Sequence, residues 1–232
     1  MVELWLAEIK MNSVNVPFNM DRSIRLVMNT ENLPWVNSYH PQVLRKSLER
    51  EKEESGEVTS VVKYEPLSTF PPHNHPFGEE IFVLEGEFAD EYGTYPRGTY
   101  LRNPPGSSHS PFSEKGCILF VKLNQFSKED TQRIIINTSE AEWLQGQGNL
   151  RVMPLHEFGG ISAALVLWPK GSRFQRHRHW GGEEIFVLEG IFQDELGSYP
   201  KGTWLRNPHL SAHDPFSDHG CKIFVKVGGL IE

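Results

Sequence analysis

The feature that most constrains the fold is an internal repeat. Residues 73–122 align with residues 177–226 without a gap, at a constant offset of 104 residues, and 33 of the 50 aligned pairs are identical. A repeat of this length is a whole domain rather than one unit of a solenoid. The sequence therefore predicts two domains of one fold, the first in residues 1–126 and the second in residues 127–232, joined near residues 126–140.

Each copy carries the pattern of an all-β domain. Its apolar runs are short, as in residues 81–84, 99–101 and 118–121, and glycine, proline, aspartate and serine separate them at close spacing. Such punctuation is typical of a sandwich or barrel. Outside the repeat, Leu44 and Leu48 stand at helical spacing, which predicts a surface helix or a charged loop over residues 41–54, and residues 139–144 resemble one capped helical turn.

Composition disfavours several classes of function. The chain has 232 residues, 38% apolar content and a formal net charge of −7, so it can bury a core and offers no basic stripe to nucleic acid. The apolar run at residues 4–7 is too short and too charged at its flanks for a signal peptide or a membrane span, so we expect a cytoplasmic protein without a membrane partner. Cys117 and Cys221 occupy matching places, which predicts two buried thiols rather than a disulfide.

Six of the ten histidines stand at three repeated positions. In the first copy, His73, His75 and Glu79 share one parity, so their side chains point to one face of an extended strand. His109 lies on a later strand or turn, and a closed antiparallel barrel can bring it opposite the other three. The sequence therefore predicts one three-histidine, one-carboxylate cluster in each half. The candidate metal ligands are His73, His75, Glu79 and His109, followed by His177, His179, Glu183 and His213.

This ligand set predicts a divalent transition metal. Imidazole and carboxylate suit iron, zinc, nickel, copper or manganese, and the absence of thiolate ligands disfavours a closed structural zinc site. Iron and zinc are the metals we expect first, with nickel and manganese also compatible. A purely structural metal ranks last, because such a set usually leaves a coordination position open to water or substrate.

A family resemblance rests on two motifs. The first copy reads H-x-H-x3-E-x6-G from His73 to Gly86 and G-x5-P-x-G-x2-H from Gly98 to His109, which resembles the two cupin motifs. The repeated G-E-E-I-F-V-L-E-G further resembles the ChrR-like cupin branch, which includes the metal-binding domain of the ChrR anti-sigma factor. This resemblance implies two tandem jelly-roll β-barrels, a bicupin, with the eight residues above as ligands.

The second motif departs from that pattern in two ways. Leu210 stands where the first copy has Gly106, which predicts a narrower second pocket, and Ser113 and Ser217 stand where many cupins carry asparagine. The pockets also differ beside the first ligand pair, where Phe77 in one copy and Trp180 in the other are candidate walls. The aliphatic residues Ile81, Val83, Ile185 and Val187 are further candidate walls.

The resemblance implies two functions of different classes. The branch is similar to acetylacetone-cleaving dioxygenase, an iron enzyme, which favours a non-haem iron dioxygenase-like activity on a small carbonyl substrate. The anti-sigma relative is associated with zinc, which favours a non-catalytic regulatory or sensing module that binds a small molecule. No separate catalytic acid or base is identifiable. Because Phe82, Leu84, Phe186 and Leu188 have the parity opposite to the ligands, they need cover, which predicts a homodimer or tight interdomain packing.

Overall fold

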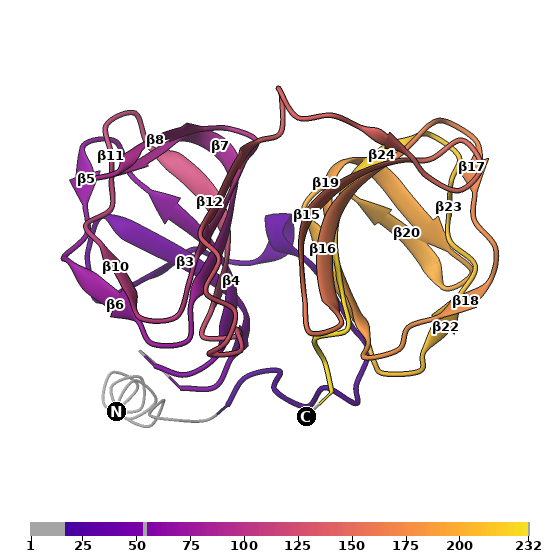
Figure 1. Cartoon of the computed structure of the whole chain (residues 1–232), viewed down its shortest axis with the longest axis horizontal. Coiled ribbons are helices and arrows are strands. Elements are labelled where there is room, and N and C mark those ends of the chain that lie inside the picture. Colours follow the sequence, from indigo (N-terminus) through magenta and orange to yellow (C-terminus); the bar gives the residue numbers. More distant parts are fainter. Residues whose placement is uncertain (1–16, 53–54, 232) are drawn as a thin grey trace, which may run out of the picture.

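The chain folds into two β-barrels that lie side by side (Figure 1). The computed structural model describes residues 17–52 and 55–231. Within them, a three-residue 3₁₀ turn, η1 (Thr30–Asn32), is the one helical element. Each barrel is built around a ten-stranded antiparallel sheet, and each holds a further two-stranded sheet. The all-β class and the two tandem barrels that the sequence predicts are therefore present.

The strands follow one another along the chain in the same order in both halves. The first half contains β1 (Leu26–Asn29), β2 (Val36–Asn37), β3 (Val43–Arg50), β4 (Val58–Tyr64), β5 (Ser68–Thr69), β6 (His73–His75), β7 (Glu79–Asp90), β8 (Gly93–Pro96), β9 (Thr99–Asn103), β10 (Ser107–His109), β11 (Phe112–Ser113) and β12 (Cys117–Leu123). The second half contains β13 (Ile134–Asn137), β14 (Leu144–Gln145), β15 (Arg151–Phe158), β16 (Ile161–Trp168), β17 (Ser172–Arg173), β18 (His177–Arg178), β19 (Glu183–Asp194), β20 (Gly197–Pro200), β21 (Thr203–Asn207), β22 (Ala212–His213), β23 (Phe216–Ser217) and β24 (Cys221–Val227).

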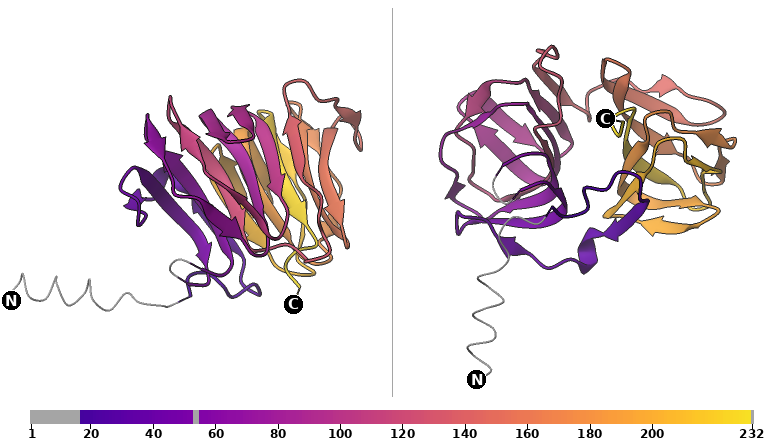
Figure 2. Two further views of the ribbon diagram at one scale, coloured as in Figure 1. Left: turned by 60° about the vertical axis from the view of Figure 1, so that its left-hand side comes forward. Right: turned by 90° about the horizontal axis from the view of Figure 1, so that it is seen from below.

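The two halves exchange their first strands. β1 pairs with β21 of the second half, so that Leu26 lies opposite Arg206, and β13 pairs with β9 of the first half, so that Ile134 lies opposite Arg102. The sheet orders are accordingly β13-β9-β7-β12-β4-β3-β2 and β1-β21-β19-β24-β16-β15-β14. In Figure 2 (right), the indigo start of the chain crosses to the orange barrel. Each barrel thus depends on a strand from the other half.

Strand alternation sends side chains of β7 to two different cores. Ile81 and Val83 belong to a cluster inside the N-terminal barrel, whereas Phe82 packs in a cluster between the barrels together with Phe186 and Phe224. Phe120 and Phe186 face each other across this interface between the two barrels, here called the seam, with ring centroids 4.8 Å apart. The cover that the apolar outward-facing residues require therefore comes from the other half of the chain. A homodimer stays a prediction.

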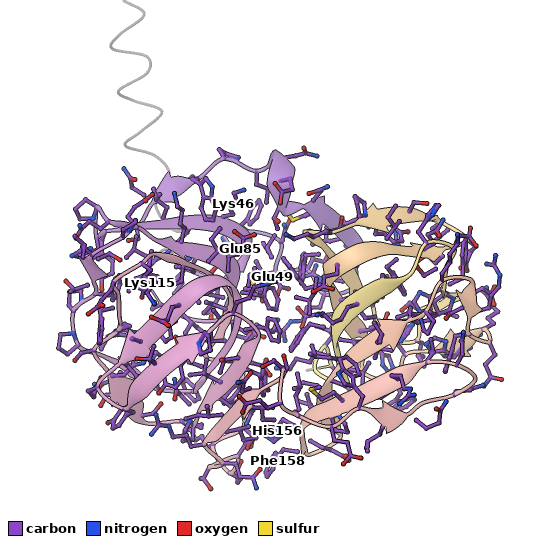
Figure 3. The ribbon with its side chains drawn as sticks, turned by 90° about the horizontal axis from the view of Figure 1, so that it is seen from above. Lys46, Glu49, Glu85, Lys115, His156 and Phe158 are labelled. Carbon is purple, nitrogen blue, oxygen red and sulfur yellow. The ribbon has the colours of Figure 1, made fainter. Side chains whose placement is uncertain are left out.

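Buried ion pairs also cross the seam between the barrels. Lys226 Nζ donates to Glu80 Oε2 over 2.7 Å, and Lys122 Nζ donates to Glu184 Oε1 over 2.6 Å, so that the repeat supplies the same pair twice. Both glutamates have the parity opposite to the ligands Glu79 and Glu183, which predicts outer-face residues with ordinary polar contacts. They are instead buried, because the outer face of each sheet is the interface. Figure 3 shows Glu49 and Glu85 near one end of this seam and His156 near the other.

Two local predictions made outside the repeat are wrong. Residues 43–50, expected in a helix or loop, form strand β3, in which Leu48 packs into the core between the barrels. Leu44 and Leu48 are four residues apart, a spacing that fits a helix but equally fits one face of a strand. Residues 138–140 form a turn closed by Asn137, whose side chain accepts from the Ser139 N–H, rather than a helical turn.

The buried cysteines agree with their predicted role, since Cys117 and Cys221 are both free thiols inside their barrels. Among the residues that the structure describes, we find no helix with the length and apolar character needed to cross a membrane.

The buried ion pairs between the barrels predict that two lysine substitutions lower the unfolding free energy by very different amounts. Lys226→Met leaves the Glu80 carboxylate buried without its cation, which should cost about 3–5 kcal/mol of unfolding free energy. Lys115→Met removes an exposed pair with Glu87, away from the seam in Figure 3, and should cost less than about 1 kcal/mol. Urea unfolding of both variants measures this, and equal losses would contradict the structural role of the buried pair.

Glu80 also predicts a specific acid sensitivity. Burial alone raises its pKa, but the charge of Lys226 and the hydrogen bonds from Lys226 and Tyr100 outweigh burial and lower the pKa to about 2. A carboxylate with a depressed pKa stabilises the fold fully above its unfolded value of 4.5, and this contribution is lost as the pH falls toward 2. Metal-free wild-type protein should therefore lose more unfolding free energy between these pH values than Glu80→Gln. Parallel losses would count against this assignment.

Candidate metal centres

The structure brings the four predicted ligands of the first half together. One ligand atom from each of His73, His75, Glu79 and His109 lies within 4.8 Å of the other three. His75, Glu79 and His109 are buried, and His73 is partly exposed. β6 pairs with β10 so that His73 lies directly opposite His109, and β7 begins at Glu79. Figure 1 shows β6 and β10 on the side of the barrel away from the seam.

Hydrogen bonds outside this cluster fix how the side chains point. His109 Nδ1 lies 3.2 Å from Asp90 Oδ2, and His73 Nδ1 lies 3.0 Å from the Pro71 carbonyl oxygen. Asn103 Nδ2 donates to Glu79 Oε2 over 2.9 Å. These contacts use the Nδ1 atoms and leave the Nε2 atoms to face the centre of the cluster. Outer partners of this kind orient ligating imidazoles in metal sites.

The inward-facing nitrogens provide the test of fit for a metal. His75 Nε2 and His109 Nε2 are buried and have no hydrogen-bond partner, and they lie 3.4 and 3.5 Å from Glu79 Oε2. Unpaired buried polar atoms are costly, so their convergence on one point needs an explanation. A cation bound between the imidazoles and the carboxylate would satisfy all of them. The donor set suits a transition metal.

The second half repeats this arrangement. One ligand atom from each of His177, His179, Glu183 and His213 lies within 4.8 Å of the others. His179 Nε2 and His213 Nε2 are buried without partners. Asn207 Nδ2 donates to Glu183 Oε2 over 2.9 Å, in the place that Asn103 takes in the first half.

Burial keeps most of these imidazoles in the form that binds metals. Burial lowers the pKa of His73, His75 and His177, and it lowers the pKa of His179 to about 3. For His109, burial also acts to lower the pKa, but the hydrogen bond to Asp90 and the charge of Glu79 raise it overall. A neutral imidazole has a lone pair free for a metal ion.

The two carboxylates differ in their electrostatic surroundings. Burial acts to raise the pKa of both glutamates. Around Glu79 the neighbouring histidines and Asn103 outweigh burial, so its pKa is lowered, whereas burial dominates at Glu183 and its pKa is raised. The two centres therefore have the same ligand types but not the same affinity for protons.

The N-terminal centre opens into a cavity of about 670 Å³. Phe77 and Ile81, both predicted as pocket walls, line it, and Arg45 of β3 adds a cation to the same wall. Strand pairing identifies Val152 as the equivalent of Arg45 in the second half. Arg45 pairs with Val62, which pairs with Leu119 of β12. Val152 pairs with Val166, which pairs with Ile223 of β24, the repeat equivalent of Leu119. The cationic wall is thus a feature of the first half.

The departures from the cupin pattern have local structural consequences. Leu210 adopts a left-handed conformation with φ of 61°, close to the 80° of Gly106, and its side chain is 44% exposed. A leucine there strains the backbone by roughly 1–2 kcal/mol. Ser113 and Ser217 are buried and donate to the carbonyl oxygens of Glu87 and Ile191. Trp180 is largely exposed and contacts the ring of His209.

Sequence reasoning missed the outer partners of the ligands. The predicted site residues do not include Asp90, Asp194, Asn103 or Asn207, although all four recur at the offset of the repeat. Their recurrence with the histidines is the signal that could have found them. Tyr95 and Tyr199, which also recur, donate to those aspartates.

The two clusters predict a separable metal content. His75→Ala and His179→Ala should each remove about one metal ion per chain, and the double variant should hold almost none, because each substitution deletes one of four ligands. His219→Ala, at an exposed histidine outside both clusters, is the matched control and should retain the wild-type content. Elemental mass spectrometry measures it, and full metal content in the double variant would overturn the ligand assignment.

Comparisons with known proteins agree with the two-barrel architecture. A family model described as the ChrR cupin-like domain matches residues 23–127 and again residues 131–231. A comparison with curated protein sequences finds no match. Among solved structures, a "putative dioxygenase" from Nostoc punctiforme is similar with a TM-score of 0.76 and 15% identity, covering 94% of this chain and 88% of the other.

Two other solved structures show the same fold at comparable coverage. Protein YlbA from E. coli matches with a TM-score of 0.67 and 15% identity, covering 95% of this chain and 96% of the other. Oxalate decarboxylase from Bacillus subtilis, studied for its Mn(II) centres, matches with a TM-score of 0.60 and 13% identity, covering 89% of this chain and 78% of the other. At such identities the likeness establishes the fold alone. The family match, which covers most of the sequence, shows that this chain belongs to the ChrR cupin-like domain family and contains two copies of that domain.

Proposed function

We propose that this bicupin is a metal-dependent enzyme of the non-haem iron dioxygenase type, which acts on a small carbonyl substrate at its N-terminal centre. The observation that carries the proposal is the position of the His73, His75, Glu79 and His109 cluster at the wall of the cavity of about 670 Å³. A buried cluster beside a cavity of this size can present an open coordination position to a small molecule.

The chain supplies surroundings suited to an enolised carbonyl compound. A divalent metal in this centre would act as a Lewis acid that polarises the oxygen atoms of a bound substrate. Ile81, Phe88 and Val121 line the cavity with apolar surface that excludes water. Arg45 stands on the same wall and would hold a substrate oxygen that carries negative charge.

The comparisons with solved structures support the proposal of a metal-dependent enzyme. The N. punctiforme protein with the same fold is described as a "putative dioxygenase", and the B. subtilis protein has Mn(II) centres. The Mn(II) centres of the second protein are compatible with a redox-capable metal, iron or manganese, in this chain.

A regulatory zinc module is the second candidate. The family description, ChrR cupin-like domain, favours it. In that case zinc would occupy the same side chains, and a small molecule bound in the cavity would be sensed rather than transformed.

Oxygen uptake by the metal-loaded protein discriminates between these functions. The chain is reconstituted anaerobically with Fe(II) and then given oxygen and a β-dicarbonyl compound such as acetylacetone. Substrate-dependent oxygen consumption that is lost in His75→Ala and retained in His179→Ala supports the enzyme at the N-terminal centre. Tightly held zinc, together with no consumption by the iron form across a panel of carbonyl compounds, would instead support the zinc module.

Arg45 provides a sharper prediction within the enzyme reading. Arg45→Met should lower kcat/KM by about 10- to 100-fold, because a hydrogen bond to a charged group contributes about 1.5–3 kcal/mol, while the metal content stays unchanged. Val152→Thr alters the equivalent place in the other barrel and should leave the rate as it is. An unchanged kcat/KM in Arg45→Met would remove this residue from substrate binding.

A further inference from the structure

The C-terminal centre contains an arginine from the first half of the chain. Arg25 immediately precedes β1, the strand that pairs with β21 in the second barrel. Strand β21 ends at Asn207, the residue that holds the ligand Glu183. Strand exchange therefore carries the Arg25 side chain to the edge of a metal centre whose four ligands all come from the other half.

Arg25 contacts three groups around that centre. Its Nε donates to Asn207 Oδ1 over 2.9 Å, and its Nη2 donates to the Tyr199 hydroxyl over 2.8 Å and to Asp194 Oδ2 over 3.3 Å. The guanidinium fork is rigid, so a single side chain fixes three acceptors relative to one another. The Asp194 side chain is only 1% exposed, and Arg25 supplies a positive charge beside it.

Two of these acceptors lie next to metal ligands. Asn207 donates from its Nδ2 to Glu183 Oε2 over 2.9 Å. Asp194 Oδ2 lies 3.5 Å from His213 Nδ1, and the Asp194 carboxylate also accepts from Tyr199. Arg25 thus holds both the hydrogen-bond partner of a ligating carboxylate and the carboxylate that lies beside a ligating imidazole.

We propose that Arg25 is a positioning residue for the C-terminal metal centre, so that the affinity of this centre for a transition metal depends on the docking of β1 from the other half. The proposal rests on the metal binding proposed above, but not on any catalytic activity. Substitution of outer partners of metal ligands typically weakens metal affinity about 10- to 100-fold. Arg25 acts through such partners, so we expect a loss at the lower end of this range.

The first half offers a natural comparison at Arg133. Arg133 immediately precedes β13, as Arg25 precedes β1, and strand exchange brings it to the N-terminal barrel. Its guanidinium lies 4.3 Å from the centre of the Tyr92 ring, and its hydrogen bond and charge act on Tyr95. Leu196 replaces Tyr92 in the second half, so the C-terminal centre lacks this ring. Arg133→Met is therefore a matched control for loss of an exchanged arginine.

The experiment isolates each centre in the full-length chain. His75→Ala leaves only the C-terminal centre complete, and His179→Ala leaves only the N-terminal one. Each background is titrated with Co²⁺, whose visible absorption reports the geometry of its ligands. In the His75→Ala background, Arg25→Met should weaken Co²⁺ binding about 10-fold, the lower end of that range, and change the spectrum. In the His179→Ala background, Arg25→Met should change neither affinity nor spectrum.

The controls separate positioning from a general loss of structure. Arg133→Met should leave the affinity and spectrum of the C-terminal centre unchanged. Arg25→Lys retains the charge but not the fork, so it should give a smaller loss confined to the C-terminal centre, and it carries the test if Arg25→Met does not fold. An unchanged C-terminal centre, or equal losses at both centres, would overturn the positioning role. Absence of Co²⁺ binding in the unsubstituted chain would instead overturn the metal assignment itself.

Discussion

The two-residue alternation of the long central strands is the constraint on which the rest of the structure depends. In β7, Glu79 and Ile81 face the inside of the barrel, where the first joins the metal cluster, while Glu80 and Phe82 face the other half of the chain. β19 repeats this division. A shift of one residue in the pairing with β12 would exchange the two faces, placing a ligand in the seam and a phenylalanine in the site. The site and the interface are thus fixed by one register.

The sequence predicted the parts of this arrangement that depend on local periodicity. Parity placed His73, His75 and Glu79 on one face, and the repeat indicated that the second half would copy them. His109 could be placed only in general terms, because its position opposite His73 depends on the pairing of β6 with β10. The prediction for residues 43–50 is wrong because the four-residue spacing of Leu44 and Leu48 fits both an α-helix and one face of a β-strand.

The strand exchange could not be predicted from local sequence patterns, because it depends on pairing between sheet edges that are far apart in sequence. A signal nevertheless exists, since Arg-x-x-x-Asn-Thr occurs at residues 25–30 and again at residues 133–138, where the offset is 108 rather than 104. The exchange places β1 beside β21 and β13 beside β9, so that each barrel contains a strand from the other half. Glu80 and Lys226, distant in sequence, meet in the buried interface between the outer faces of the two sheets.

The central claim is that each barrel holds a transition metal through three histidines and one glutamate. Elemental mass spectrometry of native protein, purified anaerobically without chelator and without a histidine tag, tests it most directly. The account predicts close to two transition-metal ions per chain, or restoration to two after incubation with Fe(II) or Zn²⁺ and removal of excess. Folded protein that holds no metal before or after that incubation would contradict it.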